Sequence, residues 1–386
     1  MPEFYLEPLT DRRTCFKCQK TGTGKKKLFK CENCHAITYC GVECQQADWD
    51  RHAWNCVPVM VTEFPGKGRG ILAARDIKMG EVIFIDKPVI RLSFDVNGSF
   101  TMSNNKALQS LKDQIDNLPS EARLQFHKLE IPNSPAINEF VQAILPSASP
   151  SDQKVFKLFI SNSKHMPLQK GSKESILYLN LSLVNHSCAP NAIEYLSRPN
   201  LGELRAVKDI AKGEEIVTCY ILDVLKYGSI SKKRTTGIKR DFDFDCKCPV
   251  CLGKVPGQEK TLKKLIEMHS KLKPVPSDWK REAGICNKIY ELTTELYIGR
   301  LDLQKIKALD ALLRTGHLAR DQVLVRKALD KWRQHAEENN YEQAQENYEA
   351  HQRRLDEWSS EFKSNRAPEK RDIEFFKGIS FYDDVK

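Results

Sequence analysis

Apolar and polar positions divide the chain into regions with different periods. From residue 59 to 94, and again from 192 to 220, short apolar runs rich in Val, Ile and Phe are separated by Gly and Pro, a pattern typical of strands. From residue 104 to 163, and again after residue 254, apolar residues recur every three or four positions, the period of an amphipathic helix. The pattern therefore predicts a β-rich unit that is interrupted by helices and followed by an all-helical region.

Length and composition fit a folded protein of up to three modules. The 386 residues are 40% hydrophobic and 29% charged, and no run approaches the roughly 18 consecutive apolar residues of a membrane helix. The first residues, Met1-Pro2-Glu3-Phe4, lack the basic and apolar segments of a signal peptide. We therefore expect a soluble protein of the cytoplasm or nucleus. A net charge of +10 fits an acidic partner or nucleic acid, and a general excess of solvated lysines explains it equally well.

Seven of the thirteen cysteines lie between residues 15 and 56. Their close spacing, in a segment too short for a hydrophobic core, favours metal thiolates over disulfides. With one histidine they form four donor pairs: Cys15 and Cys18, Cys31 and Cys34, Cys40 and Cys44, and His52 and Cys56. Eight soft donors make two tetrahedral zinc sites, and four protein ligands leave no position open for water. Both zinc ions are therefore expected to be structural.

The order of these donors, together with Tyr39, Trp49 and the run Cys44-Gln45-Gln46, resembles the MYND finger. The resemblance implies interleaved sites, the first held by Cys15, Cys18, Cys40 and Cys44, the second by Cys31, Cys34, His52 and Cys56. His35 is interpreted as an exposed histidine beside a ligand. MYND fingers imply docking of short proline-containing peptides. The eight basic residues from Arg12 to Lys30, with no acidic residue among them, are also compatible with nucleic acid, an acidic protein or a solvated loop.

Two segments far apart in the sequence indicate a second domain. The first is Gly66-Lys67-Gly68-Arg69-Gly70, whose glycines would let the backbone approach a ligand, although a plain turn also explains them. The second is Asn185-His186-Ser187-Cys188-Ala189-Pro190-Asn191, which is followed by Gly213-Glu214-Glu215 and Tyr220. Together these segments resemble a SET domain.

A third group of cysteines follows at Cys246, Cys248 and Cys251. Three thiolates cannot complete a tetrahedral zinc site, so a fourth soft donor is required, and Cys188 is the candidate. In SET proteins such a zinc clamps the post-SET segment to the core, which implies that Phe242 and Phe244 lie beside Tyr220. Two cysteines, Cys219 and Cys286, then remain as ordinary core residues.

The complete order of segments along the chain, from the finger through the SET parts to the helical tail, resembles that of the SMYD group. The resemblance is strong up to Cys251 and weak beyond it. In the best-known members a short SET segment precedes the finger, whereas here Gly68-Arg69-Gly70 follows it, an order similar to that of arthropod SMYD-like proteins. The implied fold is α+β. Its expected parts are a MYND zinc finger at 1–57, the N-terminal part of a SET domain at 58–103, a helical insertion at 104–165, the SET core at 166–222, a post-SET zinc segment at 223–253 and a helical C-terminal domain at 254–386.

The resemblance implies a protein-lysine methyltransferase that uses S-adenosylmethionine, carries three zinc ions and acts on histone or non-histone proteins. Tyr220 is the catalytic candidate and lines a lysine channel with Phe242. The implied cofactor contacts are Lys67, Gly68, Arg69, Gly70, Asn162, Asn185, His186, Tyr220 and Phe244. By its local sequence alone, Asn162 is more typical of a helix end.

A second interpretation is an adaptor or transcriptional co-regulator with a catalytically weak SET fold. The presence of Asn185, His186 and Tyr220 favours the enzyme. Phe242 favours the adaptor, because active SMYD proteins commonly have a tyrosine at that position.

Overall fold

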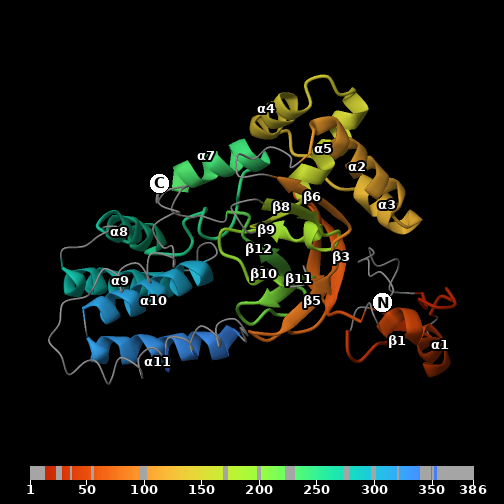
Figure 1. The fold of residues 1–386 in the computed structure, drawn as a ribbon. Coiled ribbons are helices and arrows are strands. Elements are labelled where there is room, and N and C mark those ends of the chain that lie inside the picture. Colours follow the sequence, from red (N-terminus) through yellow and green to blue (C-terminus); the bar gives the residue numbers. More distant parts are fainter. Residues whose placement is uncertain are drawn as a thin grey trace. The chain divides into compact units, whose positions relative to one another are not determined.

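The computed structural model describes residues 14–22, 28–34, 37–53, 56–94, 102–167, 173–197, 201–221, 231–272, 278–296, 301–319, 321–339, 349 and 352–353. His35, part of the basic stretch and the segment 354–386 lie outside these ranges. The chain forms two compact units (Figure 1). The first unit contains residues 1–220 and 236–246, and the second contains 221–235 and 247–386.

The first unit begins with a small zinc-finger-like segment. Its elements are β1 (Phe29–Lys30), β2 (Thr38–Tyr39) and α1 (Val42–His52), with β1 and β2 antiparallel. Tyr39 is fully buried, and its hydroxyl donates to Asp48 Oδ2 at 2.8 Å. The apolar core of the segment also includes Met60 and Ala74, which follow it in the chain. The segment therefore packs against the next part of the unit instead of standing alone.

An arginine adds polar contacts between these two parts. Arg75 Nε donates to the backbone oxygen of Asn33 at 3.1 Å, in the turn between Cys31 and Cys34. The same guanidinium pairs with Glu81 at 2.6 Å. The finger is thus joined to the segment that follows it by a shared apolar core and by the hydrogen bond from Arg75 to Asn33.

Three small sheets follow the finger. The first has the order β3-β4-β12-β9 and contains β3 (Val59–Phe64), β4 (Gly68–Ala73), β12 (Glu215–Thr218) and β9 (Asn185–His186). The second contains β10 (Ala192–Ser197), β11 (Leu201–Ala206) and β5 (Val82–Asp86), and the third β6 (Ile90–Phe94), β8 (Lys173–Leu177) and β7 (Lys164–Pro167). Among these pairings, β9 and β12 are parallel and the others antiparallel.

A helical insertion separates β6 from β7. It consists of α2 (Asn104–Asp116), α3 (Ser120–His127), α4 (Pro135–Ile144) and α5 (Pro150–Asn162). Ser134 and Ser149 cap α4 and α5 with their hydroxyls, and each is followed by a proline at the first helical position. The insertion has a core of its own, which includes Leu111, Phe126, Phe156 and Phe159. Its helices end at Asn162, three residues before the expected boundary, because Lys164 already belongs to β7.

The region after β12 is helical in the described residues. Its helices are α7 (Ser231–Phe242), α8 (Gln258–Ser270), α9 (Trp279–Thr294), α10 (Leu301–Leu318) and α11 (Gln322–Asn339). The last three pack through apolar side chains that include Leu309, Val325 and Trp332. None of the described helices is long and apolar enough to cross a membrane. The α+β class, the helical insertion and the helical C-terminal region are confirmed; α7 was not expected.

Candidate functional site

The finger brings its eight soft donors together in two groups of four. The first contains Cys15, Cys18, Cys40 and Cys44, and the second contains Cys31, Cys34, His52 and Cys56. Within the first, Cys40 Sγ lies 3.6 Å from Cys18 Sγ and 3.5 Å from Cys44 Sγ. In a tetrahedral site with Zn–S bonds of about 2.3 Å, neighbouring sulfurs lie about 3.8 Å apart, whereas a disulfide requires about 2.05 Å. The spacing therefore fits zinc and excludes disulfides.

The second group has the same spacing and indicates which nitrogen of His52 would bind a metal ion. Cys31 Sγ and Cys56 Sγ are 3.7 Å apart, and Cys34 Sγ lies 3.7 Å from Nε2 of His52. Asn33 Nδ2 donates to Cys56 Sγ at 3.2 Å, a hydrogen bond that would stabilise a thiolate ligand. The grouping of donors is the interleaved one implied by the sequence.

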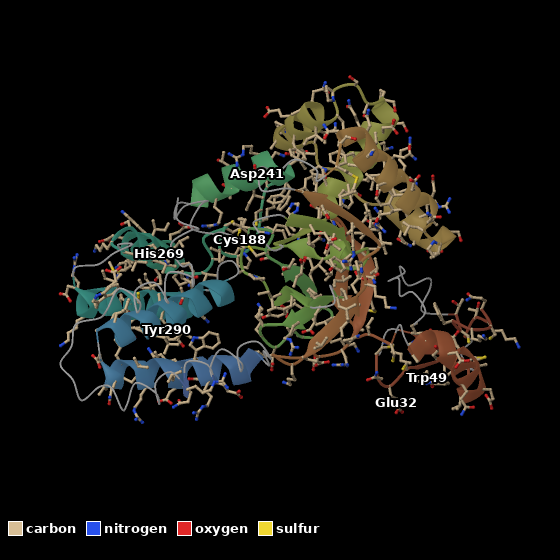
Figure 2. All side chains as sticks on the ribbon, in the orientation of Figure 1. Glu32, Trp49, Cys188, Asp241, His269 and Tyr290 are labelled. Atoms are coloured by element: carbon tan, nitrogen blue, oxygen red, sulfur yellow. The ribbon has the colours of Figure 1, made fainter. Side chains whose placement is uncertain are left out.

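The third group combines Cys188 with the cysteines that follow α7. Cys188 Sγ lies 3.8 Å from Cys246 Sγ, and the chain continues directly from Cys246 to Cys248 and Cys251 (Figure 2 labels Cys188). The four sulfurs lie within 4.8 Å of one another. Four thiolates complete a tetrahedral zinc site and leave no position open for water, which makes the expected site structural. The two remaining cysteines, Cys219 and Cys286, are buried in the apolar interior as expected.

The segment that carries Cys188 is held in place by Asn191. This side chain is almost fully buried, and its Oδ1 accepts from the backbone N–H of Val217 at 2.8 Å. Its Nδ2 donates to the backbone oxygen of Glu215 at 2.8 Å and to Glu214 Oε1 at 3.0 Å. Since both ends of the amide are satisfied by β12 and its preceding turn, Asn191 locks the parallel pair β9 and β12 together.

The glycine-rich turn between β3 and β4 lies directly against Asn185. Gly66 and Gly68 have φ values of 73° and 70°, which other residues rarely adopt. A Cβ at Gly70 would lie 2.4 Å from Asn185 Nδ2 and 2.8 Å from the ring of Phe64, so no side chain fits. No heavy atom lies within 4 Å of a Cβ built on Gly66. The turn is therefore open at Gly66 and in tight contact with Asn185 at Gly70. An open side of this kind would let the backbone approach a ligand closely.

Two of the expected cofactor contacts share one carboxylate. Lys67 Nζ lies 2.5 Å from Glu215 Oε2, and Asn185 Nδ2 donates to Glu215 Oε1 at 3.1 Å. Residues from three strands or turns far apart in the sequence thus converge at this point. Glu215 was recognised only as part of a motif, since its role as common acceptor depends on the pairing of β12 with β4.

Two other expected cofactor contacts are occupied by the helical insertion. Arg69 donates to the backbone oxygen of Lys128 at 2.7 Å and to Gln125 Oε1 at 3.2 Å. Asn162 is the last residue of α5, and its Nδ2 donates to the backbone oxygens of Glu130 and Leu158, both at 2.9 Å. The Arg69 side chain therefore connects β4 to the insertion, whereas the Asn162 side chain makes its hydrogen bonds within the insertion. Contact of either residue with a cofactor stays a prediction.

His186 connects the third cysteine group with Tyr220, which follows β12. Its Nδ1 accepts from the backbone N–H of Tyr220 at 3.0 Å. The other ring nitrogen, Nε2, therefore carries the proton and lies 3.4 Å from Cys188 Sγ. A hydrogen bond of this kind fixes the orientation of a metal ligand.

Four rings form one aromatic cluster here, those of His186, Tyr220, Phe242 and Phe244. The ring of Tyr220 lies 5.2 Å from His186, 5.4 Å from Phe242 and 6.4 Å from Phe244, measured between centroids. The Tyr220 hydroxyl donates to the backbone oxygen of Val184 at 2.8 Å. Burial, then the charges of nearby glutamates, raises the pKa of Tyr220 well above its usual value. The phenol is therefore neutral at physiological pH and can act as a hydrogen-bonding group but not as a base.

Asp243 sets the positions of the two phenylalanines. It ends α7 with φ 57°, and apart from Gln19 it is the only described non-glycine residue with positive φ. Its N–H donates to the backbone oxygen of Lys239 at 3.0 Å, and its carboxylate accepts from the N–H of Asn133 at 3.2 Å. This left-handed helix end turns the chain between Phe242 and Phe244. Nothing in the local sequence indicated this helix end, because glycine is the usual residue at such a position.

Buried Asp86 stabilises the segment that leads into β9. It accepts from the backbone N–H groups of Asn180 and Leu181 at 2.8 and 2.9 Å, and from Asn180 Nδ2 at 3.0 Å. These groups open the short 3-10 helix η3 (Leu181–Leu183), which leads directly to Asn185. Burial raises the pKa of Asp86 to about 7, despite the three hydrogen bonds.

Two family models match the chain at these sites. The MYND finger model matches residues 15–56, and the SET domain model matches residues 68–221. Human histone-lysine N-methyltransferase SMYD3 is 25% identical over 308 residues, which cover 76% of this chain and 66% of that protein. Human N-lysine methyltransferase SMYD2 is 26% identical over 254 residues, covering 65% of this chain and 54% of that protein.

The chain thus spans between about half and two thirds of the length of these relatives. A solved structure of the SET domain of LSMT bound to lysine and AdoHcy covers 88% of this chain and 97% of its own, with 13% identity and a TM-score of 0.32. The two domain matches coincide with the two metal groups of the finger and with the site built around β4, β9 and β12. A MYND finger followed directly by a SET domain places this chain in the SMYD group of proteins.

Proposed function

We propose that the protein is a protein-lysine methyltransferase that uses S-adenosylmethionine as methyl donor. The observation that carries the proposal is the continuity of one site: Gly70 touches Asn185, the next residue His186 binds the Tyr220 backbone, and Tyr220 lies among Phe242 and Phe244. When bound, the cofactor supplies a methyl group on a sulfonium sulfur, which a neutral amine attacks in line. The chain must therefore bind both reactants and position one beside the other.

Each part of the site has a task in this reaction. The turn that is open at Gly66 and the neighbouring amide of Asn185 can bind the polar amino-acid end of the cofactor, because the turn has space on one side and lies against Asn185 on the other. The neutral hydroxyl of Tyr220 can accept or donate a hydrogen bond and so orient the substrate amine. Phe242 and Phe244 exclude water from that amine, which favours its uncharged, nucleophilic form.

We further propose that three zinc ions hold this arrangement. Each of the three donor groups offers four soft ligands at tetrahedral spacing. The ions are structural, and the third acts on the site through the contact between Cys188 and His186. Elemental analysis should give three zinc ions per chain. A content of two zinc ions per chain would show that one of the three proposed sites does not bind zinc.

A second candidate function is favoured by Phe242. It lies in the aromatic cluster, where a second hydroxyl would help to orient an amine, and it provides none. The protein would then be an adaptor or co-regulator with weak catalysis. Docking of proline-containing peptides by the finger, contact with nucleic acid, and residence in the cytoplasm or nucleus belong to either function as proposals.

The decisive experiment is methyl transfer from labelled S-adenosylmethionine to proteins of a whole-cell lysate. An active enzyme labels at least one protein, and the double variant Asn185→Ala/His186→Ala abolishes the labelling. The matched control is Asn105→Ala, which changes an exposed asparagine of α2 and should label like the unaltered protein. Cofactor binding by the unaltered protein without any labelling would favour the adaptor.

A further inference from the structure

A lysine of the chain itself lies at the tyrosine of the candidate active site. Lys164 Nζ is positioned over the ring of Tyr220, 5.6 Å from its centroid. The same nitrogen lies 3.0 Å from Glu194 Oε1. Lys164 is in β7, where it pairs with Ile176 of β8, so its backbone is fixed by the sheet. All of these residues belong to the first unit.

The surroundings of Tyr220 are suited to a cation. An aromatic face and a carboxylate are the two groups that bind ammonium ions most effectively in proteins. The Glu194 side chain is only 8% exposed, so its charge is little screened by water. After burial, the charges of Glu194 and Glu215 also raise the pKa of Tyr220.

We propose that the face of Tyr220 and the carboxylate of Glu194 form a subsite for a protonated alkylamine, which Lys164 fills in place of an incoming lysine. The proposal rests on the proposed function only in identifying that amine as the lysine of a protein substrate. Two ammonium groups repel each other at such short distance, so substrate and Lys164 compete for the subsite. The residue at position 164 thus determines how readily a charged lysine enters.

Lys164 acts in this scheme as a competitor and not as a substrate. Its ion pair with Glu194 requires the ammonium form, which has no lone pair with which to attack a methyl group. The pairing of β7 with β8 also limits its movement along any channel. An incoming lysine differs because it can bind as an ammonium and lose its proton as it moves between the aromatic rings.

The first test measures binding of a single lysine, without any turnover. The probe is Nα-acetyl-lysine-methylamide, whose side-chain amine stays charged. Its binding is measured by saturation-transfer NMR on the full chain and on Lys164→Met. Removal of the competing charge should tighten binding on the order of tenfold or more. Lys164→Gln, whose amide can still donate to buried Glu194, gives the same result if the methionine variant unfolds. The control Lys154→Met removes an exposed lysine from α5 and should not change probe binding.

Two results of this test would overturn the subsite. One is equal probe binding by the unaltered chain and by both variants at position 164. The other is an equal gain for the uncharged analogue N-acetyl-norleucine-methylamide, because the variants would then have created space and not an ammonium site.

A second measurement separates the subsite from the proposed function. Transfer of labelled methyl groups to proteins of a whole-cell lysate should be faster with Lys164→Met than with the unaltered chain. If no variant transfers methyl groups but Lys164→Met gains probe binding, the proposed function fails and the subsite stands. If the unaltered chain transfers methyl groups and no variant gains probe binding, the subsite fails and the function stands. Methylation of Lys164 itself, detected by mass spectrometry, would also refute its role as competitor.

Discussion

The substitution Phe242→Tyr tests the most specific difference between this site and an active SMYD site. The ring of Phe242 is half-buried and lies 5.4 Å from that of Tyr220, in contact with Phe244 as well. A hydroxyl added at this ring would join the Tyr220 hydroxyl beside the same amine. The substitution should therefore raise the rate of the first methyl transfer and leave cofactor affinity unchanged, because Phe242 is not among the expected cofactor contacts.

The size of the effect depends on when the new hydrogen bond forms. An ordinary hydrogen bond contributes about 1 kcal/mol, and one that acts only in the transition state contributes about 3 kcal/mol. Since about 1.4 kcal/mol corresponds to a factor of ten, the expected increase lies between about 5-fold and 150-fold. The existing bond from Tyr220 to Val184 favours the lower part of this range, since one hydroxyl is already in place.

Single-turnover kinetics on any accepted substrate provides the measurement, with cofactor affinity determined separately. The reciprocal variant Tyr220→Phe, which removes the existing hydroxyl, should be slower than the unaltered chain. An unchanged or slower rate for Phe242→Tyr, with cofactor still bound, would refute the idea that a missing hydroxyl limits the protein. In that case Tyr220 suffices, and Phe242 provides room for a more highly methylated amine.

Three further substitutions test the rest of the site. Gly70→Ala should abolish cofactor binding in calorimetry, because the new Cβ would displace Asn185. The control Gly284→Ala, which adds a methyl group in open space on α9, should bind the cofactor normally and raise helix stability by about 0.5–1 kcal/mol. Cys248→Ser should lower the zinc content from three to two and prevent cofactor binding while the finger stays folded; normal cofactor binding would contradict the proposed clamp. Asp86 has a pKa raised to about 7 by burial, so the folded state holds a proton that the unfolded chain loses near pH 4. Relative to Asp86→Asn, the free energy of unfolding of the unaltered protein should therefore fall as the pH rises from about 4 to 7 in chemical denaturation, and parallel curves would show that Asp86 does not titrate in this range.

The sequence predicted those features that depend on local spacing. Close pairs of cysteine and histidine, with one to three residues between their members, indicated metal donors, and the resemblance to a MYND finger and a SET domain implied their grouping into fours. All three groups come together in space. The apolar period of residues 104–163 indicated the helical insertion, since each helix buries one face against the others. The parallel pairing of β9 with β12 was not predicted, because no local period reveals which strands will be neighbours.

Hydrogen bonds and ion pairs that join distant residues could not be predicted. Glu215 receives both Lys67 and Asn185, and Lys164 reaches Glu194 and Tyr220, only after the sheets have formed. Helix α7 was missed for a different reason. It contains many charged residues, and its apolar positions are too few to form a clear period.

The pairing of β4 with β12 has a consequence for synthesis on the ribosome. Both donor groups of the finger are complete once Cys56 has emerged, so the finger can bind metal early. The edge of β4 that later receives β12 must wait until Thr218 has been made, and the third donor group waits for Cys251. During that interval a nascent chain exposes an unpaired strand edge, which invites association with other chains. Successful production of this protein thus depends on protecting β4 for most of the time that the ribosome needs to synthesise the first unit.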